Sequence, residues 1–511
     1  MRWSVFVAAG ALSLVPAVAA PAAVRLPAVF SDNLVLQQGV PVPVWGWAEP
    51  GEQVRVTCCD REAAATADAS GRWRVKLPAL QPGPKTRLEI RGSNAITIEN
   101  VLVGEVWLCS GQSNMAMPVS RAANAEVAQQ QANHPEIRFF QVASSHAATP
   151  QDDCEGRWVV CSPETVGRFS AAGYFFAEDL HRRLKMPVGM LQAAVGGTAA
   201  EAWASRESFA SDPAFRPLLA ATDEVVEDFP AAVAAYEQQL ADWRAALKTV
   251  KQASGRRPRP PQPAYKNLPT LLFNGKIAPL IPYAVRGAIW YQGENNARGR
   301  RAYDYRRLLP LLITGWREAW GQGDFPFIAV QLPGYRQPPG EPGESDWAVI
   351  RESFVEALAC PQTGIAVTID LGEANDIHPR RKQEVGHRLA RWARAEVYGE
   401  PIVCCGPLFK AARFTGNRCI IRFDHPAGGL VAGDGEPLRQ FAIAGADRRF
   451  VWAEARIEGK DTVVVASPAV PEPVAVRYAW ADNPACCNLF SDAGLPASPF
   501  RTDDWPVIAA E

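Results

Sequence analysis

The chain has 511 residues, of which 48% are hydrophobic and 21% are charged, an ordinary globular composition that can bury a large core over roughly two to four domains. Its formal net charge is −1, which argues against nucleic acid or an anionic membrane surface as a partner. A metal site is not indicated either, because no C-x-x-C pair occurs and the 6 histidines are scattered along the chain.

The N-terminus has the features of an export signal. Arg2 supplies a positive charge, residues 5–15 form an apolar stretch too short to span a bilayer, and residues 17–19 offer an A-x-A cleavage site. No later stretch of the sequence approaches the length of a transmembrane helix. We therefore predict a signal peptide at residues 1–19 and a mature protein that is periplasmic or secreted.

Cysteines can pair in such a compartment. The chain has 11 of them, including adjacent pairs at 58–59, 404–405 and 486–487. An odd number leaves at least one thiol without a partner in the chain, and the spacing alone does not define the pairing.

Residues 24–100 have the pattern of a β segment. Short apolar runs are separated by turn signals such as residues 49–52 (Glu-Pro-Gly-Glu), and other runs alternate in the period of a half-buried strand. Short strands at close spacing predict an antiparallel sandwich layer. The expected strands are residues 29–30, 34–36, 42–47, 53–57 and 72–77.

Residues 101–400 alternate between strand and helix patterns, which predicts a parallel sheet covered by helices. The expected helices are residues 168–185, 303–320 and 382–397, and Pro310 is a potential kink in the second. The expected strands are residues 101–108, 187–195, 285–290, 325–332 and 364–370.

An insertion interrupts this alternation at residues 227–263. Residues 227–250 are helical in pattern, and residues 251–263 form a basic, proline-rich stretch. The simpler interpretation is a surface excursion with a solvated linker. The alternative is that the insertion shapes a substrate cleft.

Residues 401–511 return to a β pattern. Strands are expected at 418–423, 450–457, 461–466 and 474–480, followed by an irregular tail at 489–506. Neither terminal β segment has enough recognised strands for a complete sandwich, so we predict that the two segments pack together beside the central domain. The sequence does not indicate an oligomeric state.

Polar residues follow four of the predicted strands in the central domain. They form the stretches 111–114 (Gly-Gln-Ser-Asn), 196–198 (Gly-Gly-Thr), 292–296 (Gln-Gly-Glu-Asn-Asn) and 375–379 (Asn-Asp-Ile-His-Pro). In an open parallel α/β sheet, ligands bind at the carboxyl ends of the strands. We therefore expect these four loops to converge on one site.

These loops contain the components of a serine hydrolase. Ser113 becomes a nucleophile only when a base removes its proton, and an imidazole that titrates near neutrality makes His378 the natural base. Asp376 is the candidate that orients this imidazole. Each residue also has a simpler interpretation: His378 as a turn residue, Asp376 as a helix N-cap, and Glu294 as a structural ion pair.

An oxyanion that forms during acyl transfer needs hydrogen-bond donors. The candidates are the N–H of Ser113, a backbone N–H of Gly196 or Gly197, and a side-chain amide. The candidate amides are Gln292, Asn295 and Asn296.

The four stretches together resemble the sequence blocks of the sialate O-acetylesterase family within the SGNH hydrolases. Residues 29–37 and 478–484 are also similar to runs in this family, so the resemblance covers nearly the whole mature chain. It implies a three-layer α/β hydrolase domain that removes acetyl groups from O-acetylated carbohydrates without metal or cofactor. It also implies Ser113 as nucleophile, His378 as base, and oxyanion donors in the turn at 196–197 and the loop at 292–296.

The sequence departs from the SGNH pattern at one position. That pattern has Asp three residues before the histidine, where this chain has Asn375, and Asp376 lies only two residues before His378. Either Asp376 serves as the acid with a different loop geometry, or a backbone carbonyl orients His378 in a Ser–His dyad.

These observations predict an exported serine esterase that acts on O-acetylated carbohydrates through an acyl-enzyme. Because related members act on xylan or xyloglucan, the resemblance leaves both sialic acids and plant polysaccharides as substrates. The expected organisation is a β segment at 24–100, a catalytic domain at 101–400 and a β segment at 401–511. The alternatives are a non-catalytic carbohydrate-binding protein and a serine lipase, peptidase or esterase of different acyl preference.

Overall fold

The computed structural model describes residues 23–143, 146–249 and 261–507. The predicted signal peptide at 1–19 and most of the proline-rich stretch at 251–263 lie outside the described residues. Within the described residues, no helix combines the length and the apolar character needed to cross a membrane.

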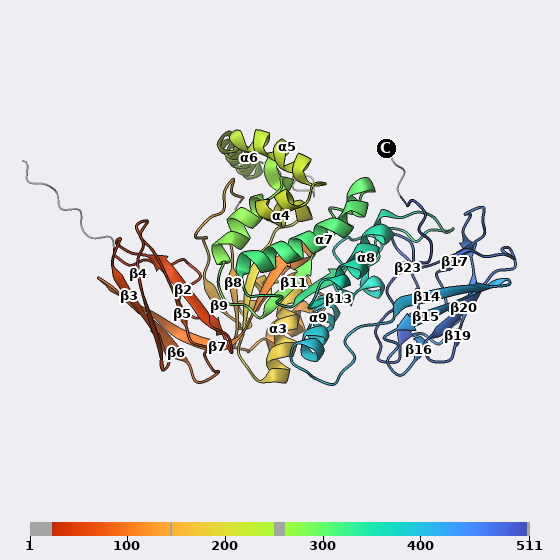
Figure 1. Cartoon of the computed structure of the whole chain (residues 1–511), viewed down its shortest axis with the longest axis horizontal. Coiled ribbons are helices and arrows are strands. Elements are labelled where there is room, and N and C mark those ends of the chain that lie inside the picture. The colour runs from red at the N-terminus through yellow and green to blue at the C-terminus, as the bar shows by residue number, and fades with distance from the viewer. Residues whose placement is uncertain (1–22, 144–145, 250–260, 508–511) are drawn as a thin grey trace, which may run out of the picture.

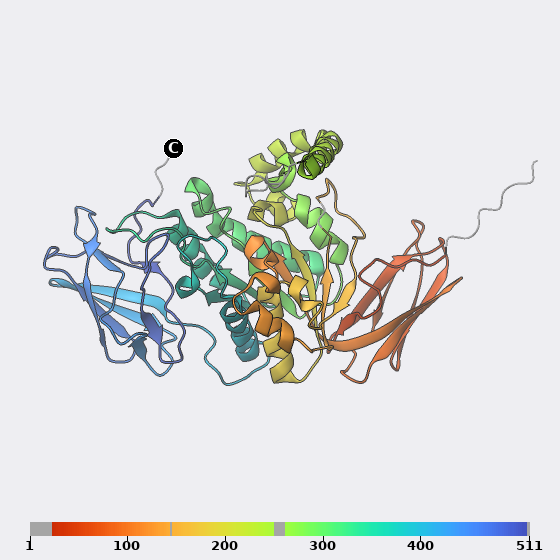
Figure 2. The same ribbon diagram turned by 180° about the vertical axis from the view of Figure 1, so that it is seen from behind.

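A central α/β body lies between two β-rich ends (Figure 1). The N-terminal segment lies at one end and the C-terminal segment at the other, and the view from behind shows the same arrangement (Figure 2). The prediction that the two β segments pack together is therefore wrong. It failed because the N-terminal strands pair with a strand that continues into the central sheet, whereas the C-terminal strands form separate sheets at the other end of the body.

The N-terminal segment is antiparallel, as predicted, apart from its first strand. Strand β2 pairs with β5, β3 pairs with β4 and β6, and β1 runs parallel to β7. Residues 29–30, predicted as a strand, form a turn in which Phe30 N–H donates to Pro27 O. The strands are β1 (Val35–Gln37), β2 (Val42–Trp47), β3 (Gln53–Cys58), β4 (Arg61–Thr66), β5 (Arg72–Leu77) and β6 (Thr86–Arg91).

Strand β7 (Ala95–Gly111) joins this segment to the central body. Its first residues pair antiparallel with β6, and its last residues pair parallel with the two strands beside it in the central sheet. The strand passes through residues 100 and 101, where the composition of the sequence places a domain boundary. The two regions therefore share one strand instead of meeting at a linker.

The central sheet has the order β13-β12-β11-β7-β10-β8-β9. Every neighbouring pair is parallel except β8 and β9, which are antiparallel. Strand β7 lies between β10 and β11, and its last residue, Gly111, is level with Ala194 and Tyr291. The loops that follow these three strands therefore leave the sheet side by side. The other central strands are β8 (Ile137–Gln141), β9 (Trp158–Val160), β10 (Val188–Ala194), β11 (Gly287–Tyr291), β12 (Phe327–Gln331) and β13 (Thr363–Val367).

Helices cover both faces of this sheet. Trp107 of β7 packs edge-on against Phe176 of α3, and Trp290 of β11 packs edge-on against Trp316 of α7. Side chains alternate along a strand, so Ser110 of β7 points to the opposite face of the sheet from Trp107. Trp290 is level with Ser110 and therefore lies on that opposite face. The helices are α1 (Ser113–Ala116), α2 (Ala125–Gln131), α3 (Ala171–Leu184), α4 (Arg206–Ser211), α5 (Arg216–Glu227), α6 (Phe229–Thr249), α7 (Gly299–Trp320), α8 (Asp346–Glu356) and α9 (Lys382–Glu396).

Two details of the helical region bear on the predictions. Helix α7 continues through Pro310 without interruption. The insertion contributes α6, which stands out from the body beside α5 (Figure 1), and the rings of Phe229 and Tyr236 contact Tyr265 at centroid distances of 5.0 and 6.1 Å.

The C-terminal segment contains two four-stranded antiparallel sheets and one two-stranded sheet. Residues 489–506, predicted to be irregular, contain the short strands β22 and β23, because two or three residues show no alternation in the sequence. The strands are β14 (Leu408–Thr415), β15 (Arg418–Asp424), β16 (Leu430–Ala432), β17 (Phe441–Ala444), β18 (Val451–Trp452), β19 (Glu454–Glu458), β20 (Thr462–Ala466), β21 (Ala475–Tyr478), β22 (Leu489–Ser491) and β23 (Phe500–Arg501).

Candidate active site

The serine lies at the turn between β7 and α1. Gly111, at the end of β7, has φ +138°, and a Cβ at this position would lie 2.2 Å from the carbonyl oxygen of Tyr291. Only glycine lets the two strands approach this closely. Gln112 then adopts extended backbone and Ser113 begins the helix, so a half-buried hydroxyl stands at the carboxyl end of the central strand.

The histidine that contacts this hydroxyl comes from a distant part of the sequence. His378 lies in the loop between η8 (Ile369–Leu371) and α9, and its Nε2 is 2.9 Å from Ser113 Oγ. This distance is within the normal range of a hydrogen bond. The two residues are 265 positions apart in the sequence, so the fold brings the predicted nucleophile and the predicted base into contact.

The carboxylate of Asp376 makes a looser contact with the same imidazole. Its Oδ1 is 3.4 Å from His378 Nδ1 and accepts a 2.8 Å hydrogen bond from the backbone N–H of His378. The Asp376 side chain is 48% exposed. Asn375, in the position where the SGNH pattern has its acid, accepts a hydrogen bond from Gln337 Nε2 at 2.9 Å.

The surroundings of the histidine favour its neutral form. Burial is the largest influence and lowers the pKa of His378, with further lowering by Lys382 and Arg121, while the Asp376 carboxylate raises it. A base works only in its neutral form, so this environment is suited to accepting a proton from Ser113 near neutral pH.

The glycine turn after β10 lies directly against the serine. A Cβ added to Gly196 would lie 3.4 Å from Ser113 Cβ, and Gly197 has φ +68°. The N–H groups of Ser113, Gly196 and Gly197 have no hydrogen-bond acceptor among the residues that the structure describes. They are therefore free to donate to an oxygen held between the turn and the serine.

The three amides of the 292–296 loop differ in their contacts. Gln292 Nε2 donates to Gln112 Oε1, Thr198 O and Asn296 Oδ1, and Asn296 Nδ2 donates to Glu201 Oε2 at 2.8 Å. Both side chains are buried and shape the loop.

Asn295 is only half-buried and stands next to the glycine turn. Its Nδ2 donates to Gly197 O at 2.8 Å and keeps a second N–H bond. Of the three amides, Asn295 is therefore the one placed to reach a ligand.

Sequence reasoning missed one residue that the structure places beside the pair. Lys382, the first residue of α9, is fully buried, and its Nζ donates to Asn114 Oδ1 at 2.6 Å and to Pro379 O at 2.7 Å. In the sequence it follows two arginines and has the pattern of a solvated cationic turn, so no local signal points to it.

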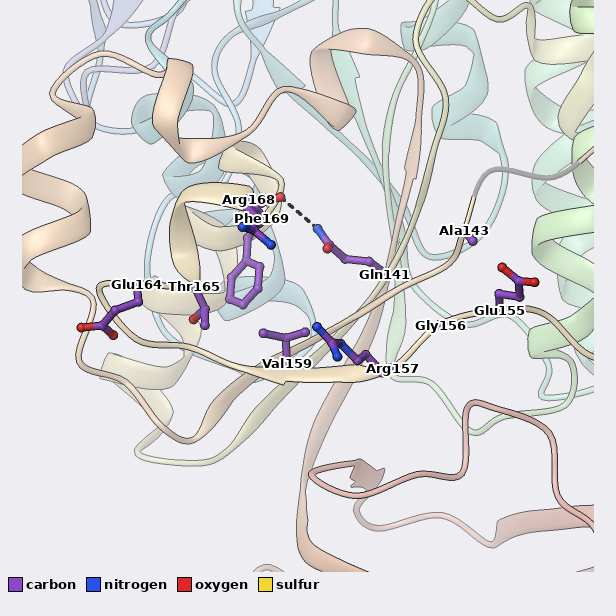
Figure 3. A pocket seen from close by; sticks show the side chains of 10 residues that line it. All are labelled: Gln141, Ala143, Glu155, Gly156, Arg157, Val159, Glu164, Thr165, Arg168 and Phe169. Carbon is purple, nitrogen blue, oxygen red and sulfur yellow. Dashed lines mark hydrogen bonds between the residues drawn. The ribbon is translucent and has the colours of Figure 1, made fainter. Parts of the chain in front are cut away.

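A separate hollow of about 640 Å³ lies along β8 and β9 (Figure 3). Gln141 and Val159 contribute to its lining from these strands, with Arg157 and Glu155 nearby. None of the residues considered as nucleophile, base or oxyanion donor lines this hollow. The contacts between the loops, and not this hollow, therefore define the candidate site.

Comparison with known families matches this chain to one of them. The family model described as carbohydrate esterase, sialic acid-specific acetylesterase matches residues 103–248 and 273–394, which together make up more than half of the chain. Both matched stretches lie in the central body and include all four loops.

Individual relatives match over nearly the whole length. Sialate O-acetylesterase of Mus musculus is 28% identical over 93% of both chains, and that of Homo sapiens is 26% identical over 93% of this chain and 92% of the human one. Among solved structures, a carbohydrate acetylesterase from Xanthomonas citri is 38% identical, with a TM-score of 0.82 over 94% of this chain and all of the other. The similarity therefore includes both terminal β segments.

Proposed function

The chain belongs to the carbohydrate esterase family of the sialic acid-specific acetylesterases, and on this premise we propose that Ser113 and His378 remove O-acetyl groups from carbohydrates through an acyl-enzyme. It is a carboxylic ester hydrolase that acts on acetylated carbohydrates. The observation that carries the mechanism is the 2.9 Å contact between Ser113 Oγ and His378 Nε2.

In the first step, Ser113 Oγ attacks the acetyl carbonyl carbon while His378 accepts its proton. The negative charge that develops on the carbonyl oxygen is stabilised by the N–H groups of Ser113 and of the Gly196–Gly197 turn and by the Asn295 amide. These donors are supported by their free N–H groups and by the contact of Gly196 with the serine.

In the second step, the bond to the sugar oxygen breaks and His378 gives the proton to that oxygen, so the sugar leaves with a free hydroxyl and the acetyl group stays on Ser113. A water molecule then loses a proton to His378 and attacks the acetyl carbon. The bond to Ser113 Oγ breaks, His378 returns the proton to this oxygen, and acetate is released. Asp376 is proposed to stabilise the charged imidazole during both steps, which its position near Nδ1 supports.

For the fold, we propose the three-layer SGNH arrangement, with residues 101–400 as the catalytic domain flanked by the β segments at 24–100 and 401–511. The parallel sheet, the helices on both faces and the serine at the end of a central strand support it.

We also propose that the protein is exported to the periplasm or the medium. The support is the apolar stretch at residues 5–15 and the A-x-A site at 17–19. Cell fractionation with and without residues 1–19 tests this, and retention of the full-length protein in the cytoplasm would contradict it.

The activity is tested by acetate release from O-acetylated sialosides, xylan fragments and xyloglucan fragments, with wild type and Ser113→Ala measured side by side. Release by wild type alone supports the mechanism and identifies the glycan class. Equal release by both proteins would exclude Ser113 as the nucleophile. A parallel series of acetyl and longer acyl esters separates an acetylesterase from a lipase.

A further inference from the structure

The loop that carries His378 has no helix or strand of its own. Residues 372–381 contain only isolated bridges and turns, although the loop must place an imidazole within hydrogen-bonding distance of Ser113. The contact with Asp376 is long and half-exposed, so it constrains the imidazole weakly. The position of the imidazole must therefore depend on the backbone on either side of His378.

Both backbone carbonyls that flank His378 are held by buried side chains. Ile377 O accepts a 2.9 Å hydrogen bond from Asn114 Nδ2, and Pro379 O accepts a 2.7 Å hydrogen bond from Lys382 Nζ. The two donors are themselves joined, because Lys382 Nζ donates to Asn114 Oδ1 at 2.6 Å.

These hydrogen bonds form a closed cycle, the hydrogen-bond ring, which includes the backbone of His378. It runs from Asn114 through the backbone of residues 377–379 to Lys382 and back to Asn114, which is the residue that follows the nucleophile. We propose that Lys382 is a positioning residue for ester hydrolysis: its amine fixes the backbone beside His378 and thereby holds the imidazole against Ser113. The inference rests on the Ser113–His378 mechanism proposed above.

The side chains of the hydrogen-bond ring are buried, so losing any of their hydrogen bonds costs free energy. Asn114 and Lys382 are fully buried, and Glu294, which accepts a hydrogen bond from Asn114 Nδ2, is 6% exposed. A buried polar group left without its partner loses solvation that nothing replaces. The loop at 377–379 therefore has a strong preference for the one position in which all these bonds form.

The amine can hold both acceptors in either protonation state. Burial lowers the pKa of Lys382 to about 7, whereas the carboxylates of Glu294, Glu373 and Asp376 raise it, and the amine also lies 5.1 Å from the centroid of the Tyr291 ring. A neutral amine still has two N–H bonds, one for Asn114 Oδ1 and one for Pro379 O. The positioning role therefore does not depend on the charge.

The test is Lys382→Met, which keeps an unbranched side chain and removes the amine. We expect kcat for a simple acetyl ester to fall by about 20-fold or more with KM within about twofold, because a misplacement of about 1 Å in a reacting group can cost about a hundredfold in rate. Inactivation by a serine-directed sulfonyl fluoride should slow in the same proportion, since it uses the same pair.

The pH profile is a readout that a purely structural role would not change in a defined direction. Of the charged groups around His378, Asp376 raises its pKa and Lys382 and Arg121 lower it. Removing Lys382 should therefore raise the pKa of His378 and move the acid limb of kcat/KM to higher pH. Because the positioning role does not depend on the charge, it is judged on the plateau above this limb, and a plateau kcat/KM equal to that of wild type would contradict the proposal.

Lys276 provides a matched control. It lies in η5 (Phe273–Ile277), is 1% exposed, and its Nζ donates to Val142 O at 2.6 Å and Ala143 O at 2.9 Å. Lys276→Met removes an equally buried amine from two carbonyl acceptors and leaves the hydrogen-bond ring at His378 intact. We expect a comparable loss of thermal stability but a kcat within about threefold of wild type.

The outcomes separate this inference from the proposed function. A loss of kcat in Lys382→Met but not in Lys276→Met supports the positioning role of Lys382. If the two variants have the same kcat, this role is overturned. If Lys382→Met does not yield folded protein, Asn114→Ala opens the same ring from the other side and is judged by the same criteria. An active Ser113→Ala would instead refute the mechanism, whatever the lysine variants show.

Discussion

Replacing Asp376 by asparagine should lower kcat by only about tenfold, far less than is usual for the acid of a catalytic triad. The carboxylate lies 3.4 Å from His378 Nδ1 and is 48% exposed. Its closer contact is with the backbone N–H of His378 at 2.8 Å, and the side-chain oxygen of asparagine can accept that bond equally well. The substitution therefore removes a charge without releasing the loop.

The magnitude follows from the distance and the exposure. Two opposite charges 3.4 Å apart attract by about 1.2 kcal/mol at the dielectric of water and about 5 kcal/mol at an effective dielectric of 20. A half-exposed carboxylate belongs near the lower value, at about 1–2 kcal/mol. Because about 1.4 kcal/mol corresponds to a tenfold change in rate, losing this attraction to the imidazolium gives about a tenfold loss.

The assay is steady-state hydrolysis of a simple acetyl ester by wild type, Asp376→Asn and Glu384→Gln. Glu384 is the control because it is an exposed carboxylate that pairs with Arg381 and, in the part of the chain that the structure describes, forms neither a hydrogen bond nor an ion pair with His378. A loss of about 10⁴-fold in Asp376→Asn would refute the reasoning, since it requires a tight, buried carboxylate–imidazole contact. An unchanged kcat would refute it in the other direction and favour a Ser113–His378 dyad.

Three further outcomes are expected. Because burial lowers the pKa of His378 below its ordinary value of 6.5, the acid limb of kcat/KM should have its midpoint below pH 6.5, and a midpoint above this value in a pH–rate profile would contradict the assignment. Gly111→Ala should lower the free energy of unfolding by about 2 kcal/mol or more in chemical denaturation, because its Cβ would overlap a carbonyl of β11, whereas Gly51→Ala, at positive φ in open space, should cost about 1 kcal/mol; equal losses would argue against the overlap. Arg286→Met should cost about 3 kcal/mol by the same measurement, because it leaves the fully buried Glu105 carboxylate without its cationic partner at 2.7 Å, and a loss below about 1 kcal/mol would show that the pair is dispensable.

Local patterns were sufficient to predict most of the secondary structure. Strand β5 alternates between buried and exposed residues, and α3 and α9 have one apolar face, so their periods are visible in the sequence. The short strands β22 and β23 carry no such period, and their pairing depends on partners elsewhere in the chain. The docking of the two β segments failed as a prediction for the same reason, since nothing in either segment encodes which surface it meets.

The site was predictable to the level of loops but not of individual contacts. Ser113 and His378 follow parallel strands, so their convergence follows from topology, and the structure places them 2.9 Å apart. The different contacts of Gln292 and Asn295 arise from acceptors in other loops, which spacing does not specify. Lys382 could not be found at all, because a buried lysine and a solvated one look alike in a sequence.

The length of β7 has a consequence for engineering. With 17 residues at about 3.3 Å each, the strand is roughly 55 Å long, and it leads from the N-terminal sheet to the turn that presents Ser113. A chimera joined at residue 100 or 101 would build this strand from two parents, although its two halves must continue as one strand from the N-terminal sheet into the central sheet. Exchange of the N-terminal end between relatives should instead place the junction before Ala95, so that the whole strand comes from the same parent as the nucleophile.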